Sequence, residues 1–433
     1  MNKTMFGIAV MASCVLLALV PANASDFTLP IFGNANMDDT IDEQDIEYVQ
    51  GIIDGAKDKT QLADANYDGK IDKDDIAQID LIIQGNEKKL TYIDNFGEAE
   101  TINEPIERLA NLGLYGIQVA RMIDAEDILL PVVGGSTIPK LKVFYSKFCS
   151  WPTTVNGNDI DFEYILSLNP DTVQPNLEMQ TYPQSSIEQK RVYQKGLPAM
   201  QIISLDFRTP NDLSRNVMTY GYLLGKRDEA KKFIDWYDNY MTMIETRVEG
   251  IPDEKKPRFF VTGEGNFGDT KTSKDRRAQA IEIAGGQNIV DDLINMTDPE
   301  SPTAITVETE WVMKQNPDYI FRIVHPGTTE LSGYELNDTA PLAAVRQKIL
   351  DMPELAQVKA VVNGNVYIID GHLDDGGGNN IIGSAYAAKL FYPDLFKDLD
   401  PENVHQEYVD RFCHFDFDVK KQGVFFYPPL NKT

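Results

Sequence analysis

The chain is poor in positive charge and in cysteine, and both shortages narrow its possible functions. It holds 40 Lys and Arg against 67 Asp and Glu, so its formal net charge is −27 over 433 residues. Nucleic acids and anionic membrane surfaces attract proteins through Lys and Arg, so neither is expected as a partner. Of the three cysteines, Cys149 and Cys413 lie so far apart in sequence that the pattern leaves their pairing open.

Sequence motifs of catalysis are also missing. There is no nucleophile elbow, no paired-carboxylate motif and no phosphate-binding loop that ends in Lys-Ser/Thr. The glycine-rich stretch Gly263–Gly268 follows a predicted strand, but no helix opens at its third glycine. This stretch is therefore predicted to be a flexible loop beside a ligand rather than a dinucleotide site, and no enzyme activity is expected.

Long hydrophobic runs are absent except at the N-terminus. Lys3 precedes an apolar run from Met5 to Val20, and Ala22-Asn23-Ala24 then forms a small-x-small cleavage pattern. Residues 1–24 are therefore predicted to be a secretory signal, with an uncleaved membrane anchor as the alternative. The protein is expected to be exported and extracytoplasmic, either secreted or associated with the cell surface or membrane.

One segment occurs twice. The two copies are residues 161–171 and 308–318. In each copy a glutamate, Glu163 or Glu310, is followed by six residues and then by Pro-Asp, and a β-branched run comes next. The pattern predicts an amphipathic helix that stops at Asn-Pro and then a buried parallel strand. Two such units predict two similar α/β lobes that close on a ligand.

The stretch Arg227–Val248 contains neither Gly nor Pro, and its apolar residues share one helical face. It is predicted to be a long, stiff helix between the lobes, so only a small hinge motion is expected on ligand binding.

These features together resemble the class III substrate-binding proteins of ABC importers, which capture ferric siderophores, haem and cobalamin. The marks are the paired repeat, the start Pro105–Leu109, the stretch Ala284–Asn288 and the stretch Val361–Tyr367. The resemblance covers about 95–415. It implies two Rossmann-like lobes, 95–225 and 256–415 with a closing helix, joined by a rigid helix at 226–250. The implied function is delivery of an iron chelate (siderophore or haem) or a corrinoid to an ABC permease.

Candidate ligand residues follow predicted strands or lie in loops. None of the four histidines lies in the first lobe, so a preformed metal chelate is expected rather than a bare ion shared between lobes. Aromatic rings could stack on the chelate or pack in the core, and arginines could pair with its carboxylates or be solvated. The expected ligand set is Tyr145, Trp151, Tyr182, Arg208, Phe267, Arg276, His325 and His372.

Glu163 and Glu310 each begin an equivalent helix, where a carboxylate is favoured by the helix N-terminus. The resemblance implies more, namely that each one pairs with arginines of one permease subunit. A twofold-symmetric permease needs one such contact from each lobe.

A second repeat lies near the N-terminus, at 31–87. The loop Asp64–Asp75 matches the calcium-loop pattern, with Gly69 at its sharp turn and an apolar helix after it. Its six expected oxygen ligands are Asp64, Asn66, Asp68, the Lys70 carbonyl, Asp72 and Asp75.

The earlier copy, Asn34–Asp45, has Asn34 in place of the first acid and Asp39 in place of the turn glycine, so weaker Ca²⁺ binding is expected. Its expected ligands are Asn34, Asn36, Asp38, Thr40, Asp42 and Asp45. The two loops, each followed by one helix, resemble a type I dockerin module. This resemblance implies a cohesin-like partner, and the alternative function is a dockerin-bearing cell-surface assembly protein whose ligand binding is secondary.

Overall fold

The computed structural model describes residues 27–132, 141–152, 155–156, 159–177, 183–263, 265–298, 301–325, 331–373 and 376–430. The predicted signal at 1–24 lies outside the described residues. Within those ranges, no helix is both long enough and apolar enough to cross a membrane.

The N-terminal module, residues 31–87, has a helix after each loop, as the sequence predicts: α1 (Glu43–Ile53) and α2 (Lys73–Gln84). Each helix begins with a capping box, formed by Asp42 with Asp45 and by Asp72 with Asp75. Because these acids also belong to the loop patterns, each loop and the helix after it form one local unit. The apolar faces of the two helices point inward and bury Val49, Ile52, Ile79 and Ile82.

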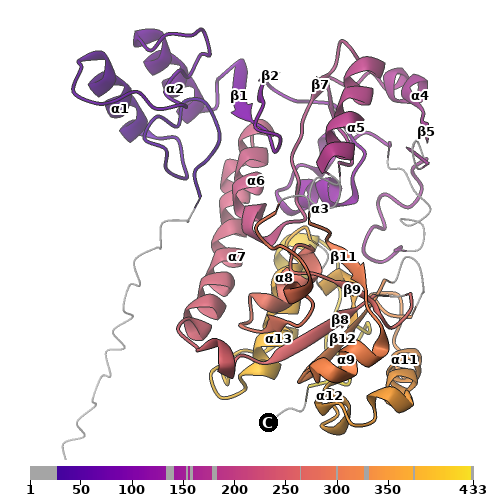
Figure 1. The fold of residues 1–433 in the computed structure, drawn as a ribbon. Helices are drawn as coiled ribbons and strands as arrows, with labels where there is room; N and C mark the ends of the chain where they lie inside the picture. Colours follow the sequence, from indigo (N-terminus) through magenta and orange to yellow (C-terminus); the bar gives the residue numbers. More distant parts are fainter. Residues whose placement is uncertain are drawn as a thin grey trace, which may run out of the picture.

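A linking hairpin of β1 (Lys89–Ile93) and β2 (Ala99–Asn103) connects the module to the first lobe (Figure 1). Ile31 of the module forms a bridge with Tyr92, and the Ile93 N–H donates to the Pro30 carbonyl at 2.8 Å. The hairpin is therefore bonded to the start of the module.

The first lobe contains a parallel sheet in the order β3-β6-β7. Its strands are β3 (Leu109–Asn111), β6 (Thr172–Gln174) and β7 (Gln201–Ile202), with a short pair β4 (Val155–Asn156) and β5 (Asp159–Ile160). Its helices are α3 (Leu114–Met122), α4 (Phe162–Ser167), α5 (Pro183–Gly196) and α6 (Pro210–Leu223).

Helix α7 (Arg227–Val248) spans the length predicted for the inter-lobe helix. It runs antiparallel to α6 and continues to the second lobe (Figure 1). Its 22 residues bury Phe233, Trp236 and Tyr237, and the Trp236 Nε1–H donates to Glu407 at 2.9 Å. This hydrogen bond joins the middle of the helix to the C-terminal part of the chain.

The second lobe is built on a sheet in the order β11-β9-β8-β12-β13-β14, with β10 beside β8. Strands β10, β8, β12 and β13 run parallel, so the α/β prediction holds here too. The strands are β8 (Arg258–Thr262), β9 (Asp269–Lys271), β10 (Gln287–Asn288), β11 (Ala304–Thr306), β12 (Tyr319–Val324), β13 (Val366–Asp370) and β14 (Phe426–Tyr427). The helices are α8 (Arg276–Glu282), α9 (Thr309–Gln315), α11 (Ala340–Leu350), α12 (Lys359–Val362) and α13 (Asn380–Phe391).

The repeated segment forms the same structure in both lobes, α4 before β6 and α9 before β12. Asn169 and Asn316 both adopt left-handed backbone, with φ of 49° and 52°, directly before the proline. Asp171 accepts the Arg108 N–H at 2.9 Å, and Asp318 accepts the Arg258 N–H at 3.0 Å. The Pro-Asp pair thus anchors the start of the neighbouring strand in each lobe, which explains why the motif occurs twice.

The C-terminal segment returns to both lobes. Helix α14 (Pro401–Tyr408) and the π-helical turn Val409–Cys413 follow α13, and this turn packs against α3 of the first lobe. Strand β14 then pairs with β13. The second-lobe sheet therefore reaches Tyr427, beyond residue 415 where the sequence placed the end of the lobe.

Candidate functional site

Tyr115, at the start of α3, lies near arginines of both lobes. The Arg208 guanidinium of the first lobe lies 6.0 Å from the centre of its ring, and that of Arg276, the first residue of α8, lies 5.8 Å away. Tyr115 follows β3 and Arg208 follows β7, so both lie beyond the carboxyl ends of parallel strands. Ligands of open α/β sheets bind at such ends.

Arg208 is held in place by its surroundings and is only 5% exposed. Its Nε donates to Asp206 at 2.9 Å, and its Nη2 donates to the Leu177 carbonyl. The Asp206 N–H in turn donates to Asn95 Oδ1, in the linking hairpin, at 3.0 Å. The position of this arginine therefore depends on the hairpin that carries the module.

Next to Arg276, a second cluster joins Asp275, Arg277 and His325. Burial raises the pKa of the Asp275 carboxyl, but hydrogen bonds and charge from Arg277 outweigh burial, and the net pKa lies below the ordinary value. The Arg277 Nη1 lies 3.1 Å from His325 Nε2. A Cβ on Gly371 would lie 2.3 Å from His325 Nδ1, so only glycine fits beside this ring.

His372 is bonded within the second lobe and touches the first. Its Nδ1 lies 2.8 Å from the fully buried Asp370, whose other oxygen accepts the Ser332 hydroxyl. Its ring centre lies 5.5 Å from that of Phe144 in the first lobe. His325 and His372 both follow strands, as predicted, and each has a specific polar neighbour.

Gln118, which sequence reasoning missed, connects the lobes. Its buried amide nitrogen lies 3.1 Å from the Gly377 carbonyl and 2.9 Å from Asn379 Oδ1. The Gly377 N–H donates to the Phe207 carbonyl at 2.7 Å, beside Arg208. The run Gly376–Gly378 after a predicted strand is the signal that could have revealed this close backbone approach.

The aromatic residues predicted as a stacking platform serve mainly as packing. Tyr145 is 3% exposed and its hydroxyl donates to Gln118 Oε1 at 3.3 Å, while the Trp151 ring packs edge-on to Phe148. Phe267 packs against Phe260, in the core of the second lobe. The core interpretation that the sequence left open for Tyr145 and Trp151 thus describes both, and Phe267, expected in a flexible loop beside the ligand, also packs against the core. Tyr182 lies outside the described residues.

Glu163 and Glu310 occupy equivalent positions on α4 and α9, and both are exposed. One helical turn further along, each helix exposes a large apolar side chain: Leu166 is 46% and Met313 is 39% exposed. The internal repeat therefore places an acid beside an apolar residue on the surface of each lobe.

The loops of the module have the internal hydrogen bonds of calcium loops, although the two differ. In the second loop, Asp64 accepts the N–H groups of Asp68 at 3.0 Å and Gly69 at 2.8 Å, and Asp75 accepts those of Asn66 and Asp72. Gly69 has φ of 90°, which suits glycine alone, as predicted. The acidic side chains of the second loop accept hydrogen bonds from the loop backbone, and their carboxylate oxygens can also coordinate a cation. The residues of this loop therefore fit Ca²⁺.

In the first loop, side-chain amides already donate hydrogen bonds to nearby carbonyl and carboxylate oxygens. The buried Asn34 amide donates to the Leu29 carbonyl at 2.8 Å and the Asp38 carbonyl at 2.6 Å, and the Asn36 amide donates to Asp38 Oδ2 at 2.6 Å. Asn34 thus uses its amide as a donor where the second loop has a carboxylate. Burial raises the pKa of Asp45, the last acid of this loop, to about 6.

A different acidic cluster is already paired with a lysine side chain of the protein. Asp94, Glu98 and Glu100 of the hairpin lie close enough to share a metal ion, but the Lys190 ammonium of α5 lies 2.7, 2.7 and 2.8 Å from them. This cluster joins the hairpin to the first lobe.

A profile of the periplasmic binding protein family matches residues 115–373, more than half of the chain. No curated protein matches the chain. Among solved structures, the chain is similar to the TroA-like periplasmic binding protein FepB from Veillonella parvula, with a TM-score of 0.59, 21% identity and coverage of 78% of this chain and 98% of that one. It is also similar to molybdate-bound MolA from Haemophilus influenzae, with a TM-score of 0.58, 16% identity and coverage of 76% of this chain and 98% of that one. For nickel-bound CeuE from Helicobacter pylori, the TM-score is 0.56 and the identity 18%, with coverage of 76% of this chain and 98% of that one.

At these identities the solved structures show the fold, and the profile shows the family. The prediction of a solute-binding protein is confirmed at that level, while its ligand stays a prediction. The chain belongs to the periplasmic binding proteins, the extracytoplasmic solute-binding partners of ABC permeases.

Proposed function

We propose that this protein binds an anionic metal chelate, of the iron-siderophore or haem type, between its lobes and delivers it to an ABC importer. The observation that carries the proposal is the pair Arg208 and Arg276, one from each lobe, whose guanidinium groups lie 6.0 and 5.8 Å from the centre of the Tyr115 ring. Guanidinium groups pair with carboxylate or other oxyanion groups, and a phenol ring can stack on a planar ligand. A corrinoid, which the family resemblance also allows, would pair less well with these two positively charged guanidinium groups.

The test is direct titration of the purified protein with haemin, a ferric catecholate, molybdate and cyanocobalamin, followed by tryptophan fluorescence and calorimetry. An absorbance spectrum and native mass spectrum of the protein as purified would reveal a ligand that it already carries. Preference for cyanocobalamin over every anionic probe would contradict the proposal.

Delivery is proposed to depend on Glu163 and Glu310. We expect that the double substitution Glu163→Ala and Glu310→Ala leaves ligand affinity intact but abolishes ligand-stimulated ATPase activity of the reconstituted importer. The reason is that one exposed carboxylate per lobe pairs with arginines on each permease subunit. The matched control is Glu188→Ala with Glu354→Ala, two exposed glutamates outside the repeated units. Full stimulation by the first double variant would leave these residues only their role at the helix starts.

Calcium binding is proposed for the second loop of the module, and much more weakly for the first. We expect Asp64→Ala to weaken Ca²⁺ binding by about tenfold or more, because it removes a charged ligand. Asn34→Ala should change the affinity little, because that amide already donates to backbone carbonyls. Calorimetry measures both, and Tyr67, within the loop, can sensitise Tb³⁺ luminescence as a second readout. Equal losses in the two variants would count against this assignment.

A second candidate function is attachment of the binding protein to a surface assembly. The two related loops, each with its capped helix, favour this function, since a dockerin-like module implies a cohesin-like partner. Binding of the full chain to a panel of purified cohesin domains, with and without EDTA, tests it. No calcium-dependent binding to any of them would remove this candidate.

A further inference from the structure

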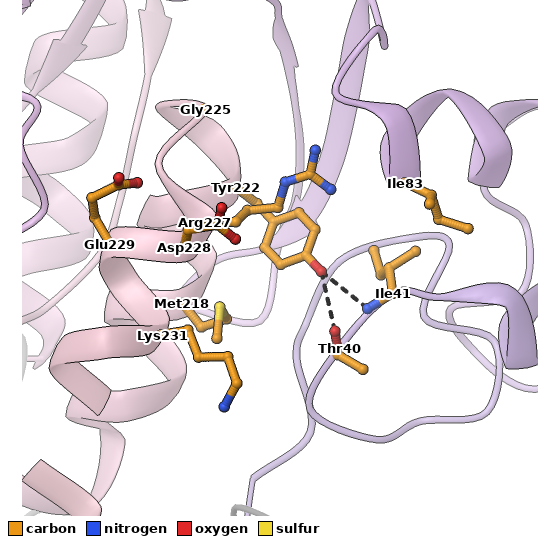
Figure 2. Close-up of a pocket in the computed structure, with 10 residues that line it drawn as sticks. All are labelled: Thr40, Ile41, Ile83, Met218, Tyr222, Gly225, Arg227, Asp228, Glu229 and Lys231. Carbon is orange, nitrogen blue, oxygen red and sulfur yellow. Dashed lines mark hydrogen bonds between the residues drawn. The ribbon is translucent and has the colours of Figure 1, made fainter. Parts of the chain in front are cut away.

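The N-terminal module contacts the C-terminal end of α6, next to the turn that leads to α7, through its first loop. The Ile41 N–H donates to the Tyr222 hydroxyl at 3.0 Å in a buried hydrogen bond, and the Thr40 hydroxyl lies 3.5 Å from the same oxygen (Figure 2). Tyr222 is 4% exposed. A buried phenol that bonds the loop backbone is a specific contact, because either group alone would lose its partner.

The second half of the module reaches the same turn. Arg227, the first residue of α7, donates to the Ile82 carbonyl at the C-terminal end of α2, at 2.5 Å. Its guanidinium lies 5.0 Å from the centre of the Tyr222 ring. A Cβ on Gly85, the left-handed residue that ends α2, would lie 2.9 Å from Arg227 Nη2. Both halves of the module therefore meet at Tyr222 and Arg227.

The linking hairpin adds a third connection. Tyr92, which pairs with Ile31 of the module, is fully buried, and its hydroxyl accepts the Ser204 N–H at 3.1 Å. The Asn95 N–H donates to the Ser204 carbonyl at 3.2 Å. Ser204 follows β7 and leads to Arg208, so the hairpin supports the segment that carries this arginine.

A pocket of about 420 Å³ lies beside the Tyr222 contacts, between the module and the two helices (Figure 2). Thr40, Ile41 and Ile83 line it from the module, and Met218, Tyr222 and Arg227 line it from α6 and α7. The directional bonds of Tyr222 and Arg227 therefore lie at the edge of a space that also separates part of the module from the two helices.

We propose that the module is a fixed part of the first lobe, and that Ca²⁺ in the second loop stabilises the lobes as well as the module. This inference rests on the proposed calcium site. Helix α2 starts within the loop, at the capping box of Asp72 and Asp75, and ends at the carbonyl that Arg227 holds. A ligand of the native state stabilises every part that unfolds together with its site.

The tryptophans allow a clean test, because all three, Trp151, Trp236 and Trp311, lie outside the module. Thermal unfolding followed by tryptophan fluorescence therefore reports the lobes alone. We expect saturating CaCl₂ to raise this midpoint by about 2–4 °C relative to EDTA. MgCl₂ should have little effect, and Asp64→Ala should remove the shift.

The double variant Tyr222→Phe with Arg227→Ala tests the contacts themselves. It should bind Ca²⁺ in calorimetry as the native chain does, while the calcium-dependent shift of the tryptophan midpoint falls by more than half. Lys231→Ala is the matched control, because Lys231 lines the same pocket but pairs with Asp235 on its own helix.

Each outcome has one meaning. Calcium binding without a shift in the native chain overturns the coupling and leaves the calcium site standing. A shift that persists in full in the double variant overturns the role of Tyr222 and Arg227. Absence of calcium binding refutes the calcium site, and this inference with it.

Discussion

Substitution of Lys190 by methionine is expected to destabilise the protein by about 3–5 kcal/mol, because it leaves the buried Asp94 carboxylate without its positive partner. The Lys190 side chain is 3% exposed and the Asp94 side chain is fully buried, while Glu100 is 27% and Glu98 is 62% exposed. Burial by itself would lower the pKa of Lys190, but its hydrogen bonds to the three acids outweigh burial and raise it. The ammonium is therefore charged, and Asp94 depends on it most.

Urea unfolding followed by circular dichroism measures this loss. Lys195→Met, at an exposed position of the same helix α5, is the control and should change stability by less than about 0.5 kcal/mol. Adding Asp94→Asn to Lys190→Met should recover part of the loss, because the neutral amide no longer requires a buried counter-charge. If the two substitutions are simply additive, the buried pair is not the source of the effect.

Substitution of Arg208 and Arg276 by glutamine is expected to weaken binding of the anionic probe by about 10–100-fold for each residue. A hydrogen bond to a charged group contributes about 1.5–3 kcal/mol, and 1.4 kcal/mol corresponds to a factor of ten. Arg276 is the cleaner test, because Arg208 also bonds Asp206 and Leu177 and its loss disturbs the segment around it.

Calorimetry with the tightest-binding anionic probe measures these losses. Arg215→Gln is the control, because Arg215 lies on α6 and pairs with Asp212 of the same helix. Affinity for a neutral probe should change much less than affinity for the anion. Unchanged anion affinity in Arg276→Gln would place the ligand elsewhere in the protein.

Much of this fold could be predicted from local patterns in the sequence. Asn169 and Asn316 adopt left-handed backbone at the helix ends, which asparagine tolerates, and the proline after each one prevents the helix from continuing. Asp171 and Asp318 then bond the backbone of the neighbouring strand. The inter-lobe helix Arg227–Val248 was likewise predictable, since it lacks helix breakers and has one apolar face. Such features depend on residues near each other in the chain, so a single sequence contains their cause.

The proposed ligand region was only partly predictable. Arg208 and Arg276 were named as candidates because a guanidinium group can pair with ligand carboxylates through two hydrogen bonds. Tyr115 and Gln118 were missed because a tyrosine and a glutamine in a helix carry no local signal. Tyr145, Trp151 and Phe267 met the same sequence criterion as the other candidates, and only the structure shows that their rings pack against neighbouring protein side chains.

By itself, the sequence determined two α/β lobes, the stiff helix between them, and a preceding pair of loop-helix units, because each follows from spacing along the chain. The tertiary structure alone decided which side chains meet across the lobes and that the module is bonded to Tyr222 and Arg227. Partners about 145 and 181 residues apart, such as Arg227 with Ile82 and Tyr222 with Ile41, share no periodicity that a sequence could reveal. Their contact results from the packing of whole elements, which local residue patterns do not specify.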